Sequence, residues 1–134
     1  MPSGRGLITN WCPQVKVLSH RSVGLFVTHA GWNSMMESVS GGVPVLCWPI
    51  FAEQPSNARM ACTEWGIGEE IPHEVKRGQF ARLVKDMMAG EKRARKEKAA
   101  EWEVKAKEAT KVGGSSYSSL DALIHDVLTT RMID

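Results

Sequence analysis

The sequence has no apolar run long enough to cross a bilayer and almost no excess charge. Its most apolar stretch, residues 43–52, is interrupted by Pro44 and Pro49, whereas a membrane helix needs roughly 20 apolar residues. The N-terminus leads into no apolar segment with a small-residue cleavage site, so we expect no secretory signal and a cytoplasmic location. With 17 basic and 15 acidic residues the formal charge is +2, which argues against a nucleic-acid partner.

Cysteine is also scarce. The three cysteines, Cys12, Cys47 and Cys62, are an odd number and lack the spacing of metal ligands. We therefore expect buried free thiols, a reducing compartment and no metal site. A chain of 134 residues is long enough for one hydrophobic core. Its composition, 43% apolar and 24% charged residues, is that of a globular protein and excludes a disordered chain.

Short apolar segments alternate with helical patterns in the first half of the chain. Strands are predicted at residues 7–9, 24–28, 43–48 and 67–71, and helices at 34–40 and 55–65. Gly41, Gly42 and Gly66 stand where helices end. This alternation predicts an α/β fold with a parallel sheet, onto which helices of the second half pack.

Two apolar stripes at helical spacing predict helices that face a core. The stripes comprise Phe80, Leu83, Val84, Met87 and Met88 in residues 76–89, and Leu120, Leu123, Ile124, Val127 and Leu128 near the C-terminus. Ser115 or Ser116 is the expected cap of the last helix.

Residues 91–111 contain eight basic residues and five glutamates. A surface for phosphate or membranes is one interpretation. The other, which we favour, is a solvated helix with a thin buried stripe. That stripe would comprise Ala99, Trp102, Ala106 and Ala109.

The most informative stretch is residues 28–34, Thr-His-Ala-Gly-Trp-Asn-Ser, where a predicted strand ends and a predicted helix begins. The first N–H groups of a helix lack internal partners, and the helix dipole is positive there, so such a junction binds phosphate. Gly31 allows close backbone approach, while His29, Asn33 and Ser34 supply side-chain donors. On the residues alone, Asn33 and Ser34 are equally well explained as plain helix caps.

Two carboxylates and one aromatic side chain extend this candidate site. Glu37 shares a helical face with Ser34. Because a carboxylate repels phosphate, Glu37 is better suited to accept two ribose hydroxyls. Glu53 and Gln54 follow the next strand and can bind several sugar hydroxyls. Trp11 offers a face for stacking a base, with core or turn packing as the alternative.

Residues 11–54 closely resemble the signature box of the plant secondary-product UDP-glycosyltransferases, a family with the two-domain GT-B fold. The matching positions are Trp11, Pro13, Gln14, Leu18, His20, Phe26, His29, Gly31, Trp32, Asn33, Ser34, Glu37, Gly42, Val43, Pro44, Pro49, Glu53 and Gln54. The resemblance continues more weakly through Asn57 and residues 64–68, 75–77 and 113–116, and is greatest to the branch that glucosylates small alcohols. Arg21, Ala30 and residues 35–36 depart from the family pattern without removing a side chain that the site needs.

The resemblance implies a role for each matching side chain. Trp11 would stack on uracil, Cys12 would contribute backbone bonds to the base, Gln14 would lie along the uridine and Glu37 would hold the ribose hydroxyls. The residues matching diphosphate ligands are His29, Asn33 and Ser34, beside Gly31. Those matching sugar contacts are Trp32, Glu53 and Gln54, and Gln at the last position usually accompanies glucose.

The implied architecture is a Rossmann-like parallel sheet with flanking helices. Residues 1–134 would form part of the C-terminal UDP-sugar-binding domain of a GT-B fold, with a helical tail from about residue 76 to residue 130 and an exposed strand edge. The N-terminal acceptor domain, which holds the catalytic His and Asp of the family, is expected to be absent. We therefore assign no catalytic residue here, and His20, His73 and His125 are not candidates for the base.

Two functions of different class follow. In the first, the chain supplies the donor site of an inverting transferase that moves glucose from UDP-glucose to a hydroxyl of a small acceptor. In the second, it is a truncated protein that binds a UDP-sugar without transferring it. We expect no cofactor or metal, no nucleic acid, no membrane span, and a monomer at full length.

Overall fold

The structure is a computed structural model that describes residues 4, 6–89 and 93–129. Its centre is a parallel three-stranded sheet in the order β1 (Phe26–Thr28), β2 (Val45–Cys47) and β3 (Gly68–Glu70). All three residues of β2 are fully buried, as expected for a central strand of a parallel sheet. The strands lie inside three of the four predicted segments, and among the described residues β1 pairs only with β2.

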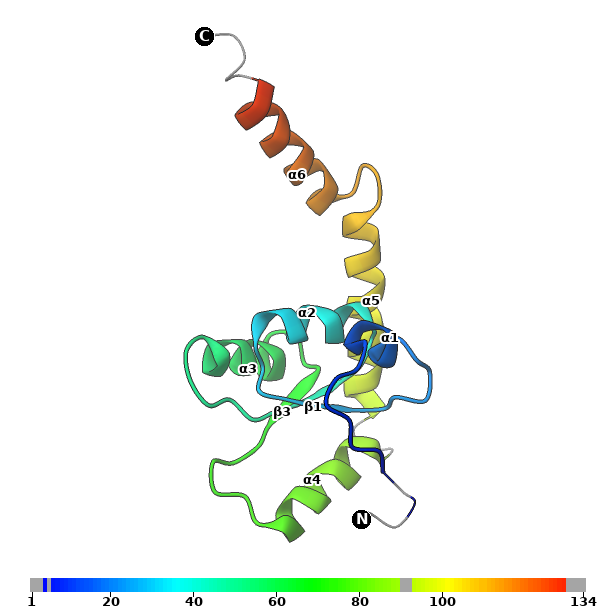
Figure 1. The fold of residues 1–134 in the computed structure, drawn as a ribbon, viewed down its shortest axis with the longest axis vertical. Helices are drawn as coiled ribbons and strands as arrows, with labels where there is room; N and C mark the ends of the chain where they lie inside the picture. Colours follow the sequence, from blue (N-terminus) through cyan, green and yellow to red (C-terminus); the bar gives the residue numbers. More distant parts are fainter. Residues whose placement is uncertain (1–3, 5, 90–92, 130–134) are drawn as a thin grey trace.

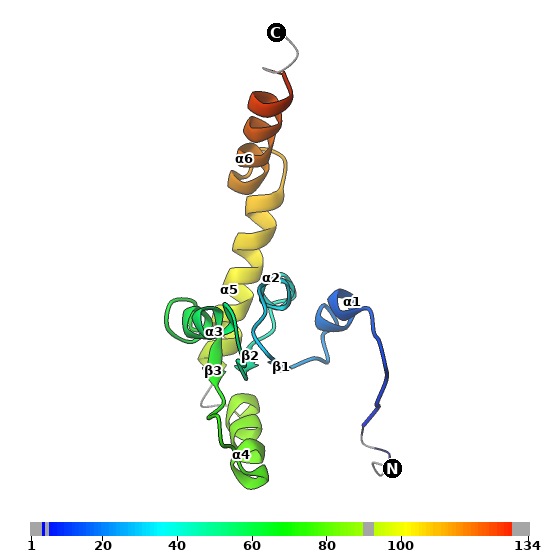
Figure 2. The same ribbon diagram turned by 60° about the vertical axis from the view of Figure 1, so that its left-hand side comes forward.

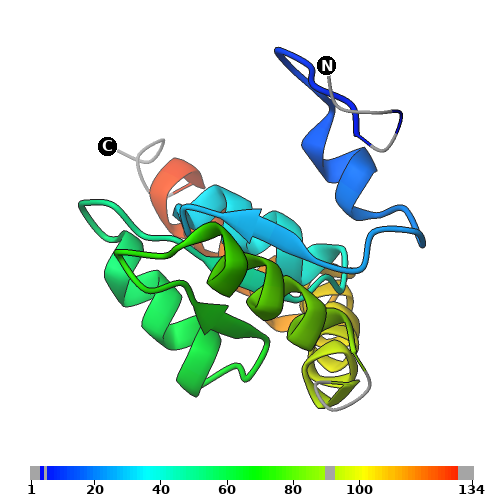
Figure 3. The same cartoon turned by 90° about the horizontal axis from the view of Figure 1, so that it is seen from below.

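Helices cover both faces of this sheet. On one face lie α2 (Trp32–Ser40), α3 (Gln54–Thr63) and α5 (Arg93–Thr110), and on the other lies α4 (Arg77–Met88) (Figure 2). Figure 3 shows α4 in front of the strands when the molecule is seen from below. The side chains of β2 alternate between two cores, because Val45 and Cys47 pack with α2, α3 and α5, while Leu46 packs with α4. The α/β prediction is confirmed.

The predicted stripe of residues 76–89 faces the second core. Met87 is buried there, and Phe80, Leu83 and Val84 pack against it, although Met88 is 59% exposed. The two glycines after α2 act as predicted, since Gly41 is the C-cap and Gly42 has a φ of 64°.

The N-terminal segment differs from the prediction. Residues 7–9 form no strand, and Leu7 and Ile8 are almost fully exposed. An apolar tripeptide becomes a strand only where a neighbour supplies hydrogen-bond partners, and within the described residues it has none. A short helix that the sequence did not indicate follows as α1 (Gln14–Leu18), and Leu18 is its buried residue.

The C-terminal stripe is exposed, which contradicts its predicted place in a core. Helix α6 (Ser115–Ile124) and the π-helical turn after it (His125–Thr129) extend away from the sheet beyond α5 (Figure 1). Leu120, Leu123, Ile124 and Val127 are between 43% and 58% exposed; the side chain of Leu128 lies outside the described residues. Periodicity identifies an apolar face but not what covers it. The N-cap is Gly114, so the expected serine cap is also wrong.

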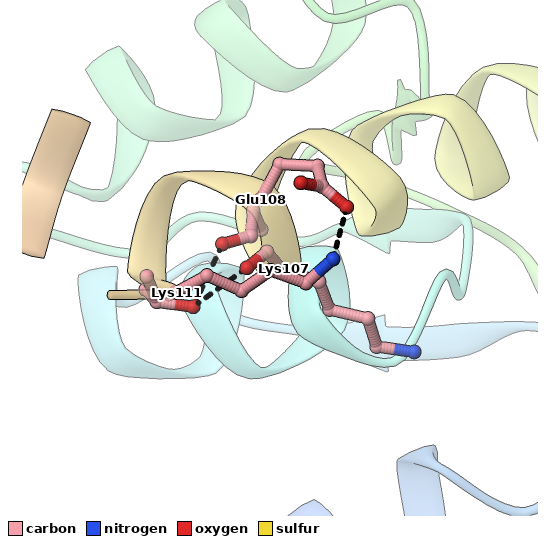
Figure 4. Close-up of polar contacts among 5 residues, drawn as sticks. Lys107, Glu108 and Lys111 are labelled. Atoms are coloured by element: carbon pink, nitrogen blue, oxygen red, sulfur yellow. Dashed lines mark hydrogen bonds and ion pairs between the residues drawn. The ribbon is translucent and has the colours of Figure 1, made fainter. Parts of the chain in front are cut away.

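The charged segment is a solvated helix, as favoured; residues 91 and 92 lie outside the described residues. Ala99 of α5 is fully buried in the first core, with Trp102 and Ala106 packed beside it. The exposed side of α5 carries pairs of opposite charge one helical turn apart, including Lys111 with Glu108 near its end (Figure 4).

The three thiols lie in different environments. Cys47 is buried and Cys62 is partly buried, but Cys12 is exposed, so the expectation of a buried thiol is wrong for Cys12. A hydrogen bond with the Cys62 thiol, together with burial, raises the pKa of Cys47 far above its ordinary value. In the part of the chain that the structure covers, no helix has the length and apolar character needed to span a membrane.

Candidate donor site

The turn between β1 and α2 has an unusual backbone. Ala30 has a φ of 63°, in the left-handed region that side chains with a Cβ disfavour, and it is fully buried. Gly31 follows as the N-cap of α2, with a φ of −63° and a ψ of 144°. The chain thus turns sharply from the strand into the helix at these two residues.

Neither Asn33 nor Ser34 is the N-cap of α2, so the interpretation of these residues as plain caps is wrong. The helix starts at Trp32, and its first internal bond runs from the Met35 N–H to the Gly31 carbonyl, 3.0 Å. Gly31 has no side chain, and among the described residues no side-chain capping hydrogen bond forms at this end of α2. The N–H groups of the first three helical residues therefore have no helical acceptor and are available to an anion.

A hollow of about 500 Å³ opens at this end of α2. It is lined by His29, Gly31, Trp32, Asn33, Ser34 and Glu53. These residues come from segments that follow β1 and β2, at the carboxyl ends of parallel strands where α/β sheets bind ligands. All six belong to the set that the sequence predicted.

A second hollow of about 420 Å³ lies along the N-terminal segment and is lined by Thr9, Asn10, Trp11, Cys12 and Gln14. Trp11 is 78% exposed, so its alternative role in core packing is wrong, and its ring is free to stack on a ligand. Three of the four residues that match uridine contacts therefore lie in one hollow, and Glu37 is outside it.

Gln14 connects the two hollows. Its Nε2 donates to Glu37 Oε2 at 2.5 Å and to Ser34 Oγ at 3.2 Å, which ties α1 to the first turns of α2. Gln14 borders one hollow and Ser34 the other, so this pair of hydrogen bonds links the walls of the two hollows.

Two predicted residues, Glu37 and Gln54, line neither hollow; Glu37 is reached through Gln14, whereas Gln54 is turned into the protein. Its side chain is only 6% exposed, and its Oε1 accepts the N–H groups of Ile50 at 2.9 Å and Phe51 at 3.3 Å. Gln54 borders neither hollow, whereas its neighbour Glu53 is exposed and borders the first. Any contact from Gln54 to a sugar would use its amide nitrogen, since the carbonyl oxygen already accepts two hydrogen bonds.

Sequence reasoning named Trp32 and Trp102 separately but missed that Trp65 joins them behind the site. The ring of Trp32 lies 6.4 Å from that of Trp65, which lies 5.9 Å from Trp102. The Trp102 indole N–H donates to the Trp65 carbonyl at 3.1 Å. This aromatic row joins α5 to the wall of the first hollow, and no local pattern in the sequence indicates it. Among the described residues, no cluster of His, Cys, Asp or Glu is arranged to hold a metal ion.

Solved structures place this fold in a known class. The chain is similar to Os79 from O. sativa in complex with UDP and deoxynivalenol-3-glucoside, with a TM-score of 0.86 and 32% identity over 91% of this chain and 29% of that one. It is also similar to a UDP-glucose:anthocyanidin 3-O-glucosyltransferase in complex with UDP, with a TM-score of 0.82 and 32% identity over 86% of this chain and 26% of that one. The fold is that of part of the C-terminal domain of a GT-B glycosyltransferase.

The family follows from the sequence comparisons. A sequence model described as UDP-glucoronosyl and UDP-glucosyl transferase matches residues 3–99, so the chain belongs to this family. It is 53% identical to UDP-glycosyltransferase 85A8 of Stevia rebaudiana and 52% identical to (R)-mandelonitrile beta-glucosyltransferase of Prunus dulcis. Each match covers 92% of this chain but 26% of the relative, so the chain spans about a quarter of these proteins.

Proposed function

We propose that this chain binds UDP-glucose and forms the donor side of an inverting glucosyl transfer to a hydroxyl of a small molecule. The observation that carries the proposal is the first hollow. In it, six residues predicted to bind the sugar nucleotide meet at the N-terminus of α2, which no side chain caps. The relatives that are glucosyltransferases and the neighbours solved with UDP support it.

Each part of the donor has a place along the two hollows. The uracil stacks on the exposed Trp11 ring beside the Cys12 backbone. The ribose hydroxyls bond to Glu37, whose Oε2 accepts from Gln14 at the border of the same hollow. The diphosphate lies at the α2 N-terminus with His29 and Ser34 as further donors. Since Gln14 already bonds Glu37, ribose binding replaces or shares this contact.

The glucose then lies between Trp32 and the Glu53 carboxylate, which border the first hollow, with the Gln54 amide nitrogen behind them. During transfer the acceptor oxygen attacks the anomeric carbon from the opposite face, the bond to UDP breaks, and the configuration inverts. The backbone N–H groups at α2 stabilise the negative charge that develops on the departing diphosphate.

The acceptor proton passes to a base outside the described site. In the family this base is a His oriented by an Asp, both in the N-terminal acceptor domain, and we propose that the same division applies here. The proposed reaction uses no metal or cofactor. We further propose that the chain functions in the cytoplasm.

The test is UDP-glucose binding by calorimetry for the wild type, Glu37→Ala and the control Glu74→Ala. Both variants lose one carboxylate, but Glu74 is an exposed residue of the segment between β3 and α4. We expect Glu37→Ala to weaken binding by about tenfold, since a ribose hydroxyl loses a charged acceptor. Equal affinities for both variants would contradict the assignment of Glu37.

The second candidate function, binding without transfer, is separated by a UDP-release assay on the 134-residue chain with mixed small alcohols. We expect no release from the chain alone, because our proposal assigns the base to the acceptor domain of the family and to none of these residues. Turnover would show instead that the 134 residues contain the base.

A further inference from the structure

The left-handed residue of the donor turn is held by hydrogen bonds to both sides of its backbone. The Ala30 N–H donates to Thr28 Oγ1 at 3.2 Å, and the Ala30 carbonyl accepts from Asn57 Nδ2 at 3.0 Å. Thr28 ends β1, whereas Asn57 lies on α3, 27 residues along the chain from Ala30. All three residues are at least 94% buried.

Such a conformation persists only where the surroundings enforce it, because a residue with a Cβ disfavours a positive φ. Thr28 is anchored in the sheet, where its carbonyl accepts the Trp48 N–H at 2.8 Å, and its hydroxyl reaches only the N–H side of Ala30. Asn57 is different, since it belongs to a separate helix packed against the sheet by Ala58 and Ala61. Its hydrogen bond therefore ties the carbonyl side of Ala30 to α3.

The peptide after Ala30 leads directly into Gly31, the N-cap of α2. A rotation of this peptide would redirect the first N–H groups of the helix and the His29 ring, which packs on Gly31. His29 and Gly31 both line the hollow, so such a rotation would change its wall. The Asn57 amide has no place in either hollow, so any effect of Asn57 on a ligand acts through this backbone.

We propose that Asn57 is a positioning residue for the donor diphosphate, acting by clamping the Ala30 carbonyl in the left-handed turn. This inference rests on the proposed function, because it assumes that the diphosphate binds at the α2 N-terminus. It goes further in assigning to a buried amide on α3 a part in ligand affinity.

The test combines Asn57→Ala with Ala30→Gly and measures UDP affinity by calorimetry well below each variant's unfolding midpoint. Asn57→Ala should weaken UDP binding by roughly tenfold, the equivalent of one buried hydrogen bond. Ala30→Gly alone should have little effect. In the Asn57→Ala background it should recover a large part of the loss, because glycine adopts a positive φ without a steric penalty.

Two controls separate positioning from general stability. Ser56→Ala changes an exposed residue on the same turn of α3 and should leave UDP affinity unchanged. Hydrogen exchange without ligand should accelerate at the amides of residues 30–34 in Asn57→Ala, and Ala30→Gly should not slow the exchange of α3. Asn57→Asp keeps the shape but cannot donate in its charged form, so it should bind UDP as weakly as Asn57→Ala.

The outcomes distinguish this inference from the function on which it rests. If the wild type fails to bind UDP, the proposed function is wrong and the clamp falls with it. If the wild type binds and a folded Asn57→Ala binds equally well, Asn57 serves stability alone and only the clamp is overturned. A loss of affinity that Ala30→Gly does not reduce also contradicts the clamp.

Discussion

The substitution Gly31→Ala tests the donor turn with very little change to the rest of the molecule. The φ of −63° and ψ of 144° at Gly31 suit any residue, so alanine introduces no backbone strain. Its Cβ, however, would lie 2.5 Å from His29 Nε2, 3.2 Å from Cδ2 and 3.3 Å from Cε1. The added methyl group therefore competes with the imidazole for one position.

The size of the effect follows from this geometry. To reach the 3.4 Å of ordinary contact from 2.5 Å, the imidazole nitrogen must move by about 0.9 Å. A hydrogen bond lengthened by that amount is lost. A bond to a charged group contributes about 1.5–3 kcal/mol, which corresponds to a loss of UDP affinity of roughly tenfold to 150-fold.

The assay is calorimetric titration with UDP, accompanied by thermal unfolding. The matched control is Gly78→Ala on α4, where an added Cβ meets nothing within 4 Å. We expect Gly78→Ala to keep full affinity and at least the stability of the wild type, because Gly78 lies in the first turn of α4. Unchanged UDP affinity in a folded Gly31→Ala protein would refute the assignment of His29 to the diphosphate.

Three further predictions concern the cores and the thiols. Leu123→Ser should change the free energy of unfolding by less than about 0.5 kcal/mol, because Leu123 is 58% exposed. Leu46→Ala in the buried sheet should instead cost about 2–5 kcal/mol. Equal losses of stability for the two variants in urea unfolding would show that α6 packs in a core. Because the raised pKa keeps the Cys47 thiol neutral in the folded state while it ionises near 9.0 in the unfolded chain, its stabilising contribution is present below pH 9.0 and is lost above it. Wild-type stability should thus fall above pH 9.0 more steeply than that of Cys47→Ala, by up to about 1.4 kcal/mol per pH unit, and parallel curves would contradict this. With a thiol reagent at neutral pH, exposed Cys12 should react first and buried Cys47 last. Mass spectrometry of the labelled peptides gives the order of reaction, and the opposite order would contradict this prediction.

The sequence predicted the sheet and its main helices because their signals are local. Residues 43–48 are apolar without alternation, which is typical of a strand buried on both faces, and β2 lies within them. The stripe with Phe80 and Met87 has helical periodicity, and α4 follows it. The phosphate turn was predicted from residue types that are needed at a strand-to-helix junction.

The remaining features depend on contacts that are distant in sequence. The positive φ of Ala30 depends on a hydrogen bond from Asn57, and nothing in an alanine indicates it. Helix α1 is tied to α2 by Gln14, whose partners also lie far along the chain. The face of α6 that includes Leu123 has the pattern of a core helix, but a pattern does not identify the surface that would cover it.

The measurement that tests the account most directly is a titration of the ¹⁵N-labelled chain with UDP-glucose, followed residue by residue by NMR. We expect saturable shifts at the amides of residues 29–34, at the Gln14 side-chain amide and at the indole N–H groups of Trp11 and Trp32, which border the two hollows. The amides of α6 should stay unchanged. No saturable shift at residues 29–34, or shifts confined to other surfaces, would contradict a donor site at the N-terminus of α2.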